Sequence, residues 1–408
     1  MKTVIMVAAA LAFGVNAGAQ GIDEILRSVE RNNKELKALG EQGRADALDI
    51  EAQNNLEDPS VEYSPFFAKG VSGIATSELV VKQGFDFPTL YAARSKSGKL
   101  QKEVVNLGYQ TSRCNILLSA KQLCLDLILL NQERDLLEKR RKNADELLAM
   151  YETRMKNGDA TVLEVNKVKM DRMNVQTEVT QNEVAHQTAL QSLLALNGNM
   201  PLEFDMRQYP SSEAVVDYEA LYDRAVASEL TLRSARAEVQ ASAQNVKVNR
   251  QNWLPKLEVG YRRNTDGSDA SNGFMVGASF PLFSGRNRLK SAKARLQESE
   301  LQLDNVRVRT ENNVRSQVNE MKQLRHAADT YDTALLYSTL DLLRKAVEGG
   351  ELSLIEYYVE ADAIYRNLQT QMHLGNKYQK VWAELTKGDL LTIWCSAMTE
   401  KHDGRALY

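Results

Sequence analysis

Gly158–Glu164 reads GDATVLE, and 192 positions later Gly350–Glu356 reads GELSLIE. Both share the pattern Gly-x-x-Ser/Thr-apolar-apolar-Glu, and each follows a long run of helix-forming sequence. The glycine can end a helix in the left-handed conformation. The Ser or Thr, with Glu three positions later, predicts a capping box that starts the next helix. The recurrence predicts two internal structural repeats, each with long helices joined by this turn.

Two long helices are expected before these turns. Residues 109–157 and 286–348 contain neither Gly nor Pro, and the second run would be about 95 Å long as a single helix. Apolar residues step by three or four along both runs, which predicts a narrow coiled-coil seam. The seam residues are Ile116, Ala120, Leu123, Leu127 and Leu130 in the first run, and Val314, Val318, Met321, Leu324, Ala328, Tyr331 and Leu335 in the second.

Shorter helices surround this pair. The seven prolines all avoid the helical stretches, and Pro201 and Pro210 mark a linker between the two halves. Because Pro breaks helix interiors, its placement divides the chain. The further helices are expected at Ile22–Asn54, Val162–Leu196, Tyr218–Asn252 and Leu354–Thr386.

Four segments alternate apolar and polar residues with period two: Val61–Phe67, Ser77–Phe87, Leu257–Arg263 and Phe274–Phe280. A half-buried hairpin is one interpretation of this pattern. Strands that span a membrane alternate in the same way. Four strands are too few to close a barrel, for which about eight are needed, and an open sheet in lipid leaves backbone groups unpaired. If these strands span a membrane, several copies of the chain must share one barrel.

The N-terminus has the form of a secretory signal. Lys2 supplies the charge, Val4–Val15 is apolar, and Ala17–Ala19 offers small residues for cleavage. Beyond residue 20 no transmembrane helix is expected, because no stretch of 18 apolar residues appears. The chain is therefore expected to be exported, with residues 1–19 as a signal peptide.

The sequence shows no motif for nucleic-acid binding, disulfide formation or catalysis. The net charge of −3 gives no basic footprint for nucleic acid. Cys114 and Cys124 would lie about 15 Å apart on one helix, too far for a disulfide, and Cys395 lies in the tail. The sequence has no phosphate-binding Gly-rich loop and no nucleophile elbow. No enzyme, no cofactor and no metal site is therefore expected, since the histidines also lack metal-ligand spacing: His186, His326, His373 and His402.

Further motifs flank the expected strands. Trp253–Leu257 reads WLPKL and Phe280–Arg286 reads FPLFSGR, with weaker counterparts LEDP at Leu56–Pro59 and FDFP at Phe85–Pro88. Together with the two glycine turns, their order and spacing resemble the TolC-like outer-membrane efflux proteins, or outer membrane factors. The resemblance covers nearly all of the chain after the signal. The compact belt near 197–217 and the short C-terminus are closer to the heavy-metal-efflux branch.

The resemblance implies a mainly α fold with a small β part. Three chains, each giving four strands, would form a β-barrel that is continued by an α-barrel of long coiled-coil helices. The expected divisions are 1–19 signal peptide, 20–197 first repeat, 198–217 equatorial linker, 218–388 second repeat and 389–408 C-terminal tail.

The resemblance also implies a function. The homotrimer would be a passive conduit across the periplasm and the outer membrane of a Gram-negative cell. Its substrates would come from an inner-membrane pump of the RND or ABC type and a periplasmic adaptor protein. The substrate itself cannot be read from the sequence. The alternative is a periplasmic coiled-coil interaction protein without a pore, which would stay out of the outer membrane.

The resemblance assigns roles to the repeated turns. They would be the periplasmic tips that contact the adaptor, and three copies of an acidic residue near each tip would form a charged ring at the gate. The gate candidates are Glu164, Glu356 and Glu360. In the family a second acidic residue is common three positions after the first, but this chain has Val359 at that position, and Glu360 is its neighbour. The tip residues are Asn157, Gly158, Thr161, Val162, Leu163, Gly349, Gly350, Ser353, Leu354 and Ile355.

Overall fold

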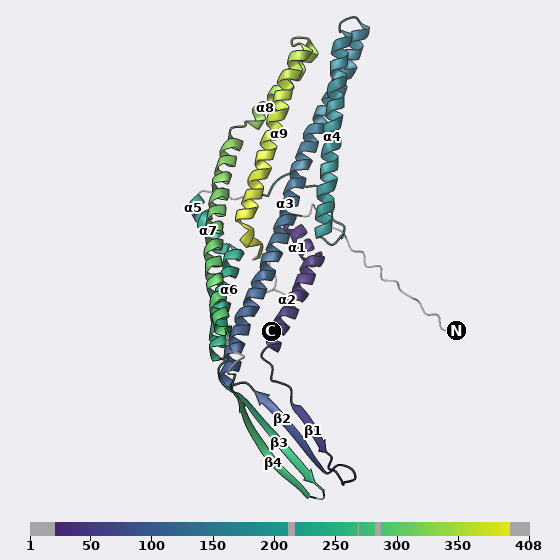
Figure 1. Ribbon diagram of the computed structural model, residues 1–408. Helices are drawn as coiled ribbons and strands as arrows, with labels where there is room; N and C mark the ends of the chain where they lie inside the picture. Colours follow the sequence, from purple (N-terminus) through teal and green to yellow (C-terminus); the bar gives the residue numbers. More distant parts are fainter. Residues whose placement is uncertain (1–20, 211–216, 268, 282–286, 392–408) are drawn as a thin grey trace, which may run out of the picture. The chain divides into compact units, whose positions relative to one another are not determined.

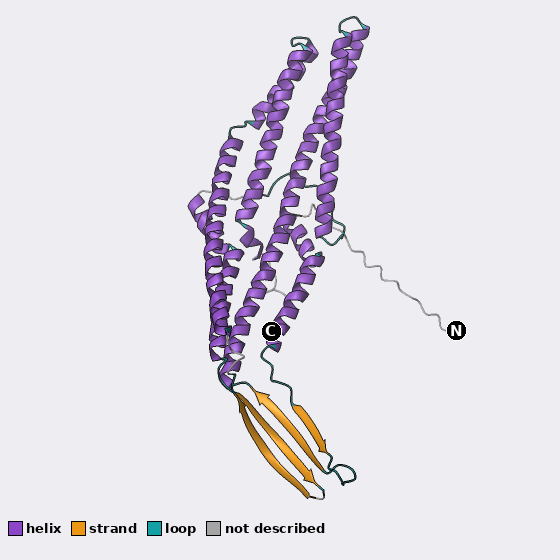
Figure 2. Ribbon diagram, viewed as in Figure 1, coloured by secondary structure: helices purple, strands orange, loops and turns teal. Residues whose placement is uncertain are grey.

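The computed structural model describes residues 21–210, 217–267, 269–281 and 287–391. In these ranges the chain is mostly helical, with one antiparallel sheet of four strands (Figures 1 and 2). The predicted mainly α fold with a small β part is confirmed. The signal peptide at 1–19, most of the FPLFSGR motif and Cys395 lie outside the described residues. The trimer, the two repeats and the domain boundaries stay predictions.

The chain divides into two compact units. The described residues of the first unit fall in 21–34, 116–210 and 320–384, and those of the second in 35–115, 217–319 and 385–391.

The first unit contains two helical hairpins, and in each of them a glycine turn joins the two helices (Figure 1). One consists of α3 (Pro88–Lys156), from Ile116 onward, and α4 (Val162–Leu196). The other consists of α8 (Thr333–Gly349) and α9 (Leu354–Leu385). Their shared core is apolar and buried, and its most enclosed members are Leu147, Val168, Val347, Leu354, Tyr357, Ala361 and Leu368.

Helix α1 (Ile22–Asn32) is held against the end of α4 by amide side chains. Ser28 Oγ donates to Asn197 Oδ1 at 2.9 Å, and Asn33 Nδ2 donates to the carbonyl of Leu196 at 2.8 Å. Gly198 has φ +66°, and a Cβ there would lie 2.5 Å from the carbonyl oxygen of Asn32. Glycine is therefore required by both conformation and space.

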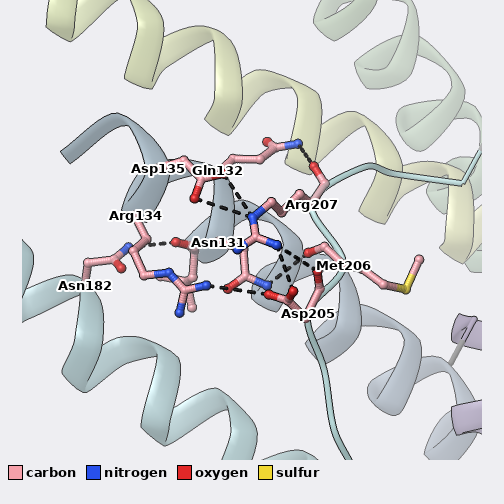
Figure 3. A network of polar contacts seen from close by, with 9 residues as sticks. Asn131, Gln132, Arg134, Asp135, Asn182, Asp205, Met206 and Arg207 are labelled. Atoms are coloured by element: carbon pink, nitrogen blue, oxygen red, sulfur yellow. Dashed lines mark hydrogen bonds and ion pairs between the residues drawn. The ribbon is translucent and has the colours of Figure 1, made fainter. Parts of the chain in front are cut away.

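The residues after α4 form a short belt, 197–210, which is bonded to α3 (Figure 3). Asn131 Nδ2 donates to the carbonyl of Met206 at 2.9 Å, and Arg207 Nε lies 3.1 Å from Asp135 Oδ2. Arg207 also reaches Asp205 at 2.8 Å. Side chains of α3 thus bind the belt at Met206 and Arg207.

The second unit carries the sheet and the helices that lead into it. The sheet has the order β1-β2-β3-β4, with every pair antiparallel. Its strands are β1 (Ser60–Phe66), β2 (Thr76–Phe85), β3 (Lys256–Asp266) and β4 (Asp269–Ser279). The helical elements of this unit are α2 (Lys34–Ala52) from Glu35, α3 up to Asn115, α5 (Tyr218–Ser228), α6 (Leu230–Gln251), α7 (Arg288–Asp329) up to Asn319, and the 3-10 helix η1 (Lys387–Leu391).

The predicted strands are confirmed in place, with different ends. The second hairpin is longer than expected, because most of the predicted loop Asn264–Asn272 continues the β3–β4 ladder. Asp266 pairs with Asp269, and Gly267 has φ +57°. Only two residues separate this last pair, so the connection is shorter than the predicted loop.

The two faces of the sheet differ in chemistry. Residues paired directly opposite one another share a face, and Val61, Val81, Tyr261 and Phe274 form one continuous row across all four strands. All four side chains are exposed, Phe274 by 93%. The opposite face carries the intervening polar residues, among them Glu62, Glu78, Lys82, Glu258 and Arg262, and Arg262 is paired with Glu78 at 2.7 Å.

Helices α4 and α9 occur as predicted, α9 ending one residue early at Leu385. Helix α3 is longer than expected because it starts at Pro88 and contains Gly98 and Gly108. Glycine inside a helix costs about 1 kcal/mol relative to Ala. At Gly98 a Cβ would lie 3.2 Å from Ile50 Cγ2, so the glycine allows α2 to approach closely.

Three of the predicted helices are interrupted. The expected helix 286–348 is wrong as a single element: α7 ends at Asp329 and α8 begins at Thr333. Asp332 caps α8 by accepting the N–H of Leu335 at 2.9 Å. An acidic N-cap can start a new helix where no Gly or Pro is present. The absence of Gly and Pro from 286–348 therefore did not reveal the break between α7 and α8.

The other two interruptions have similar causes. Ile22–Asn54 divides into α1 and α2 at Asn33, whose side chain is bonded to α4, as described above. Tyr218–Asn252 divides into α5 and α6 at Glu229, whose side chain accepts from the N–H of Thr231. Polar side chains at these positions compete with the continuous helix.

The predicted seam is only partly right. Its residues in α3 are buried or half-buried, but the buried surface of α3 is broad and also includes Leu117, Leu125 and Ile128. Helices α4 and α9 and the belt all bond to this stretch of α3, which explains the width. In the second run the seam ends at the α7–α8 break, and Leu335 beyond it is exposed.

One window of 18 residues in α3 has a mean hydropathy of 1.3, enough by length and composition to cross a membrane. None was expected after residue 20. Since 61% of this window is buried, α3 has the character of a core helix, and the described residues hold no second such helix.

The sheet yields a test of its packing. A Cβ at Gly260 in β3 would lie 2.7 Å from the carbonyl oxygen of Val81 in β2, whereas one at Gly273 in β4 would meet nothing within 4 Å. Gly260→Ala is expected to destabilise the protein by about 1–3 kcal/mol because the strands must move apart. Gly273→Ala is expected to stay within about 0.5 kcal/mol. Thermal unfolding followed by circular dichroism measures both, and equal losses would contradict the register.

Candidate functional site: the two helical tips

Both glycine turns end their helices with the same hydrogen bonds. At the end of α3, Gly158 has φ +83°, its N–H donates to the Met155 carbonyl at 3.1 Å, and the next N–H, of Asp159, donates to Arg154 at 2.8 Å. These two bonds define a Schellman motif. The predicted left-handed helix end is confirmed.

The end of α8 repeats this arrangement. Gly350 has φ +77°, its N–H donates to the Val347 carbonyl at 3.3 Å, and Glu351 N–H donates to Ala346 at 2.9 Å. The left-handed conformation costs other L-residues about 1–2 kcal/mol. Glycine at both positions therefore follows from the turn itself.

Both following helices begin with the predicted capping box. At α4, Thr161 Oγ1 accepts the N–H of Glu164 at 3.2 Å, and the Glu164 carboxylate accepts the N–H of Thr161 at 2.7 Å. At α9, Ser353 Oγ accepts the N–H of Glu356 at 3.3 Å, and Glu356 accepts the N–H of Ser353 at 3.1 Å. In each tip, hydrogen bonds therefore fix both the end of one helix and the start of the next.

The caps lower the pKa of both glutamates. At Glu164 the main cause is the backbone N–H of Thr161, followed by its hydroxyl, and at Glu356 it is the Ser353 hydroxyl, followed by its backbone N–H. Both bonds favour the ionised carboxylate. Glu360, the third gate candidate, is exposed on α9 one turn after Glu356 and on the same helix face.

The tips differ in which apolar side chain they expose. In the first tip Val162 and Leu163 are both exposed, Leu163 by 75%. In the second tip Ile355 is exposed, but Leu354 is only 2% exposed and belongs to the shared core. The expectation that Leu354 offers contact area is therefore wrong for this chain, because the side chain points inward. Asn157, Gly158, Thr161, Gly349, Gly350 and Ser353 are exposed as expected.

A charged cluster below the tips was missed by the sequence analysis. Arg140 of α3 contacts Asp171 at 3.2 Å and Glu178 at 3.1 Å, both in α4, and Asp362 of α9 at 3.1 Å. The Arg140 side chain is only 11% exposed, and its guanidinium lies 4.9 Å from the Tyr365 ring centroid. One arginine therefore joins three helices.

Burial and opposite charges compete in setting the pKa values of this cluster. Burial disfavours the charge of Arg140, but the carboxylates of Glu178, Asp171 and Asp362 outweigh it and raise the pKa. Burial raises the pKa of Asp171 against the opposing effect of Arg140. The guanidinium stays charged, and the cluster depends on it.

Polar pairs link α3 to α9 at intervals of seven residues along α3. Asp126 binds Lys380 at 2.8 Å, Glu133 binds His373 at 2.9 Å, and Arg140 binds Asp362. We call these three pairs the polar ladder. Charged residues at 126, 133 and 140 share one helix face, so their heptad spacing was a signal that the sequence offered.

The described residues contain no group of three or more His, Cys, Asp or Glu side chains suited to a metal ion. His373 is engaged by Glu133, as above, and His186 is buried in α4. Cys114 and Cys124 are buried, free thiols, and burial raises the pKa of Cys124 to about 12. The raised pKa of Cys124 is the opposite of the lowered pKa of a reactive thiol.

The Arg140 cluster gives a stability test. Arg140→Met leaves three carboxylates near one another without their counter-ion, and we expect a loss of about 3–5 kcal/mol. The matched control is Arg172→Met, which breaks an exposed pair with Asp145 in the same hairpin at 2.6 Å and should cost about 1 kcal/mol or less. Denaturant unfolding compares them, and equal losses would show that burial of Arg140 does not matter.

The caps give a pH test. Because the folded pKa of Glu164 and Glu356 is lowered from 4.5, the caps stabilise the tips above that pH and are lost as pH falls through the folded pKa. Hydrogen exchange, corrected for the intrinsic rate, should show loss of protection at the two tips only below pH 4.5. Glu164→Gln should abolish this pH dependence at the first tip and leave it at the second. A midpoint above 4.5 in the wild type would contradict the caps.

Comparison with known proteins supports the family assignment. Residues 221–388 match the sequence model of the outer membrane efflux protein family. No curated protein sequence matches the chain significantly.

Solved structures share its fold. The CmeC outer membrane channel of Campylobacter jejuni matches with a TM-score of 0.74 and 14% identity, covering 90% of this chain and 85% of CmeC. The outer membrane protein VceC of Vibrio cholerae gives 0.71 and 17%, covering 90% and 95%. The open state of the MtrE outer membrane channel of Neisseria gonorrhoeae gives 0.67 and 12%, covering 90% and 88%.

These matches confirm the resemblance inferred from the turns and strand motifs. The family is one of channel proteins, not of enzymes. Residues 221–388 match the model of the outer membrane efflux protein family, and the chain as a whole shares the fold of the solved outer membrane channels.

Proposed function

We propose that this chain is the outer-membrane channel component of a tripartite efflux pump. Three copies form a passive conduit across the periplasm and the outer membrane. An inner-membrane pump of the RND or ABC type and a periplasmic adaptor deliver the substrates. The energy comes from the pump, and the channel itself has no catalytic step.

The observation that carries this proposal is the open sheet. Among the described residues, strands β1 and β4 are each paired on one side only. One face of the sheet is apolar and exposed, with Phe274 and Val276 almost fully accessible. In lipid an unpaired strand edge costs several kcal/mol per group. Three copies supply twelve strands, more than the eight or so that a closed barrel requires.

The helices of the first unit also expose apolar side chains in a single chain. Leu163, Met170 and Met173 on α4 are exposed and follow heptad spacing, and Ile355 and Val359 do the same on α9. Such exposed stripes are typical of helices that pack against further helices. They support a tunnel wall in which neighbouring copies cover these faces.

The tips are suited to docking an adaptor. Val162, Leu163 and Ile355 present apolar area on backbone that the Schellman motifs and capping boxes hold rigid. Rigid presentation lowers the entropy cost of binding. At the mouth of the tunnel, three copies each of Glu164, Glu356 and Glu360 provide the acidic rings of the gate.

The experiment that tests this function combines fractionation and conductance. The wild-type protein should sediment with the outer membrane, run as a heat-modifiable trimer, and give single-channel currents in planar bilayers. A monomer that remains in the periplasmic fraction without conductance would instead support the pore-free coiled-coil protein.

The tip assignment yields a further prediction. Gly350→Pro should abolish crosslinking to the adaptor, because Pro fixes φ near −65° where the turn has +77° and removes the N–H bonded to Val347. Gly350→Asn is the matched control, since Asn tolerates the left-handed conformation and keeps its N–H. It should retain crosslinking within about threefold of wild type, given a strain of roughly 0.5 kcal/mol. Undiminished crosslinking in the Pro variant, with the trimer intact, would place the adaptor elsewhere.

A further inference from the structure

A basic pocket lies in the second unit where the strands meet the helices. It has a volume of about 380 Å³ and is lined by residues from the start of α3, the end of α6, β3, β4 and the start of α7. Three of the lining residues are cationic, namely Arg94, Lys256 and Arg288. The pocket therefore lies where the described residues on both sides of the second hairpin meet the start of α3.

The pocket has more positive than negative charge. Arg94 is paired with Asp86 at 2.6 Å, and Lys256 is paired with Glu57. Arg288 is exposed at the first turn of α7, and within the described ranges it has no ion pair. Three cations thus face two carboxylates, which leaves one guanidinium available to an anion.

Two exposed aromatic residues belong to this part of the chain, one in the pocket lining and one next to lining residues in the sequence. Phe280 lines the pocket and is 64% exposed. Trp253 is 71% exposed and lies between Asn252 and Leu254, which both line the pocket. Beyond the pocket, β3 and β4 continue into the exposed apolar face of the sheet. Basic and aromatic residues next to a lipid-facing surface are typical of the membrane–water interface.

We propose that this pocket binds the phosphate headgroup of a phospholipid in the leaflet nearest the helices. The inference rests on the proposed function, because only a membrane-inserted sheet brings lipid to this level. The Arg288 guanidinium donates to phosphate oxygens, for which its planar fork is well suited. Trp253 and Phe280 contact the glycerol and upper acyl region. The excess positive charge favours an anionic lipid over a zwitterionic one.

Quenching of tryptophan fluorescence tests this site. The full-length protein, purified as the trimer in detergent, is titrated with phosphatidylglycerol that carries brominated acyl chains. Saturable quenching of Trp253 is expected, and the Trp253→Phe variant gives the background from the other tryptophans. Brominated phosphatidylcholine should bind more weakly. Arg288→Gln should weaken binding of phosphatidylglycerol about fivefold, the effect of one basic residue at an anionic lipid surface.

The matched control is Arg309→Gln, an exposed arginine on the same helix about 31 Å further along. It should bind as wild type does, and Arg288→Lys should recover part of the loss. Each variant is first checked for the intact trimer. Equal binding by Arg288→Gln and wild type would overturn the proposal. Displacement of the lipid by inorganic phosphate at matched ionic strength would do so as well, since it would show a site for free phosphate.

The outcome is separable from the channel function. A wild-type trimer that conducts but shows no saturable lipid quenching defeats only the lipid site. A wild type that neither inserts nor conducts defeats the proposed function itself.

Discussion

Unpaired backbone at the two edges of the sheet is the constraint on which the architecture depends. Strands β1 and β4 each leave one row of N–H and C=O groups without a strand partner in the part of the chain that the structure describes. Water can satisfy such groups, but hydrocarbon cannot. The apolar row through Val61, Val81, Tyr261 and Phe274 is suited to hydrocarbon. If the sheet lies in lipid, as the proposed function requires, neighbouring copies of the chain must pair with its edges.

The tips show how little sequence is needed to fix a geometry. GDATVLE and GELSLIE are identical only at the first Gly and the final Glu. Both also have an acidic residue second, a hydroxyl residue fourth and apolar residues at the other positions. Yet both give a Schellman motif followed by a capping box. Glycine is set by the positive φ, and the hydroxyl and carboxylate are set by the free N–H groups at a helix start. The apolar positions are free to differ, and they do: Val162 faces outward and its counterpart Leu354 is buried.

The features that the sequence predicted correctly are therefore those that depend on residues close together in the chain. The tips, α4 and the positions of the strands followed from glycine, caps and period-two alternation. The breaks at Asn33, Glu229 and Asp332 did not, because a polar side chain that ends or restarts a helix looks like any surface residue until its partner is known. Leu335 was assigned to a seam that stops before it. The Arg140 cluster depends on three helices meeting, which a single-helix pattern cannot show, although the seven-residue spacing of Asp126, Glu133 and Arg140 was visible in advance.

The polar ladder between α3 and α9 has a mechanical consequence. At its three levels charged and imidazole groups tie the two helices together, in addition to the apolar core that the helices share. Each polar pair forms at only one alignment of α9 along α3, whereas apolar side chains tolerate several. The ladder therefore selects one alignment of two helices whose cohesion comes from the apolar core.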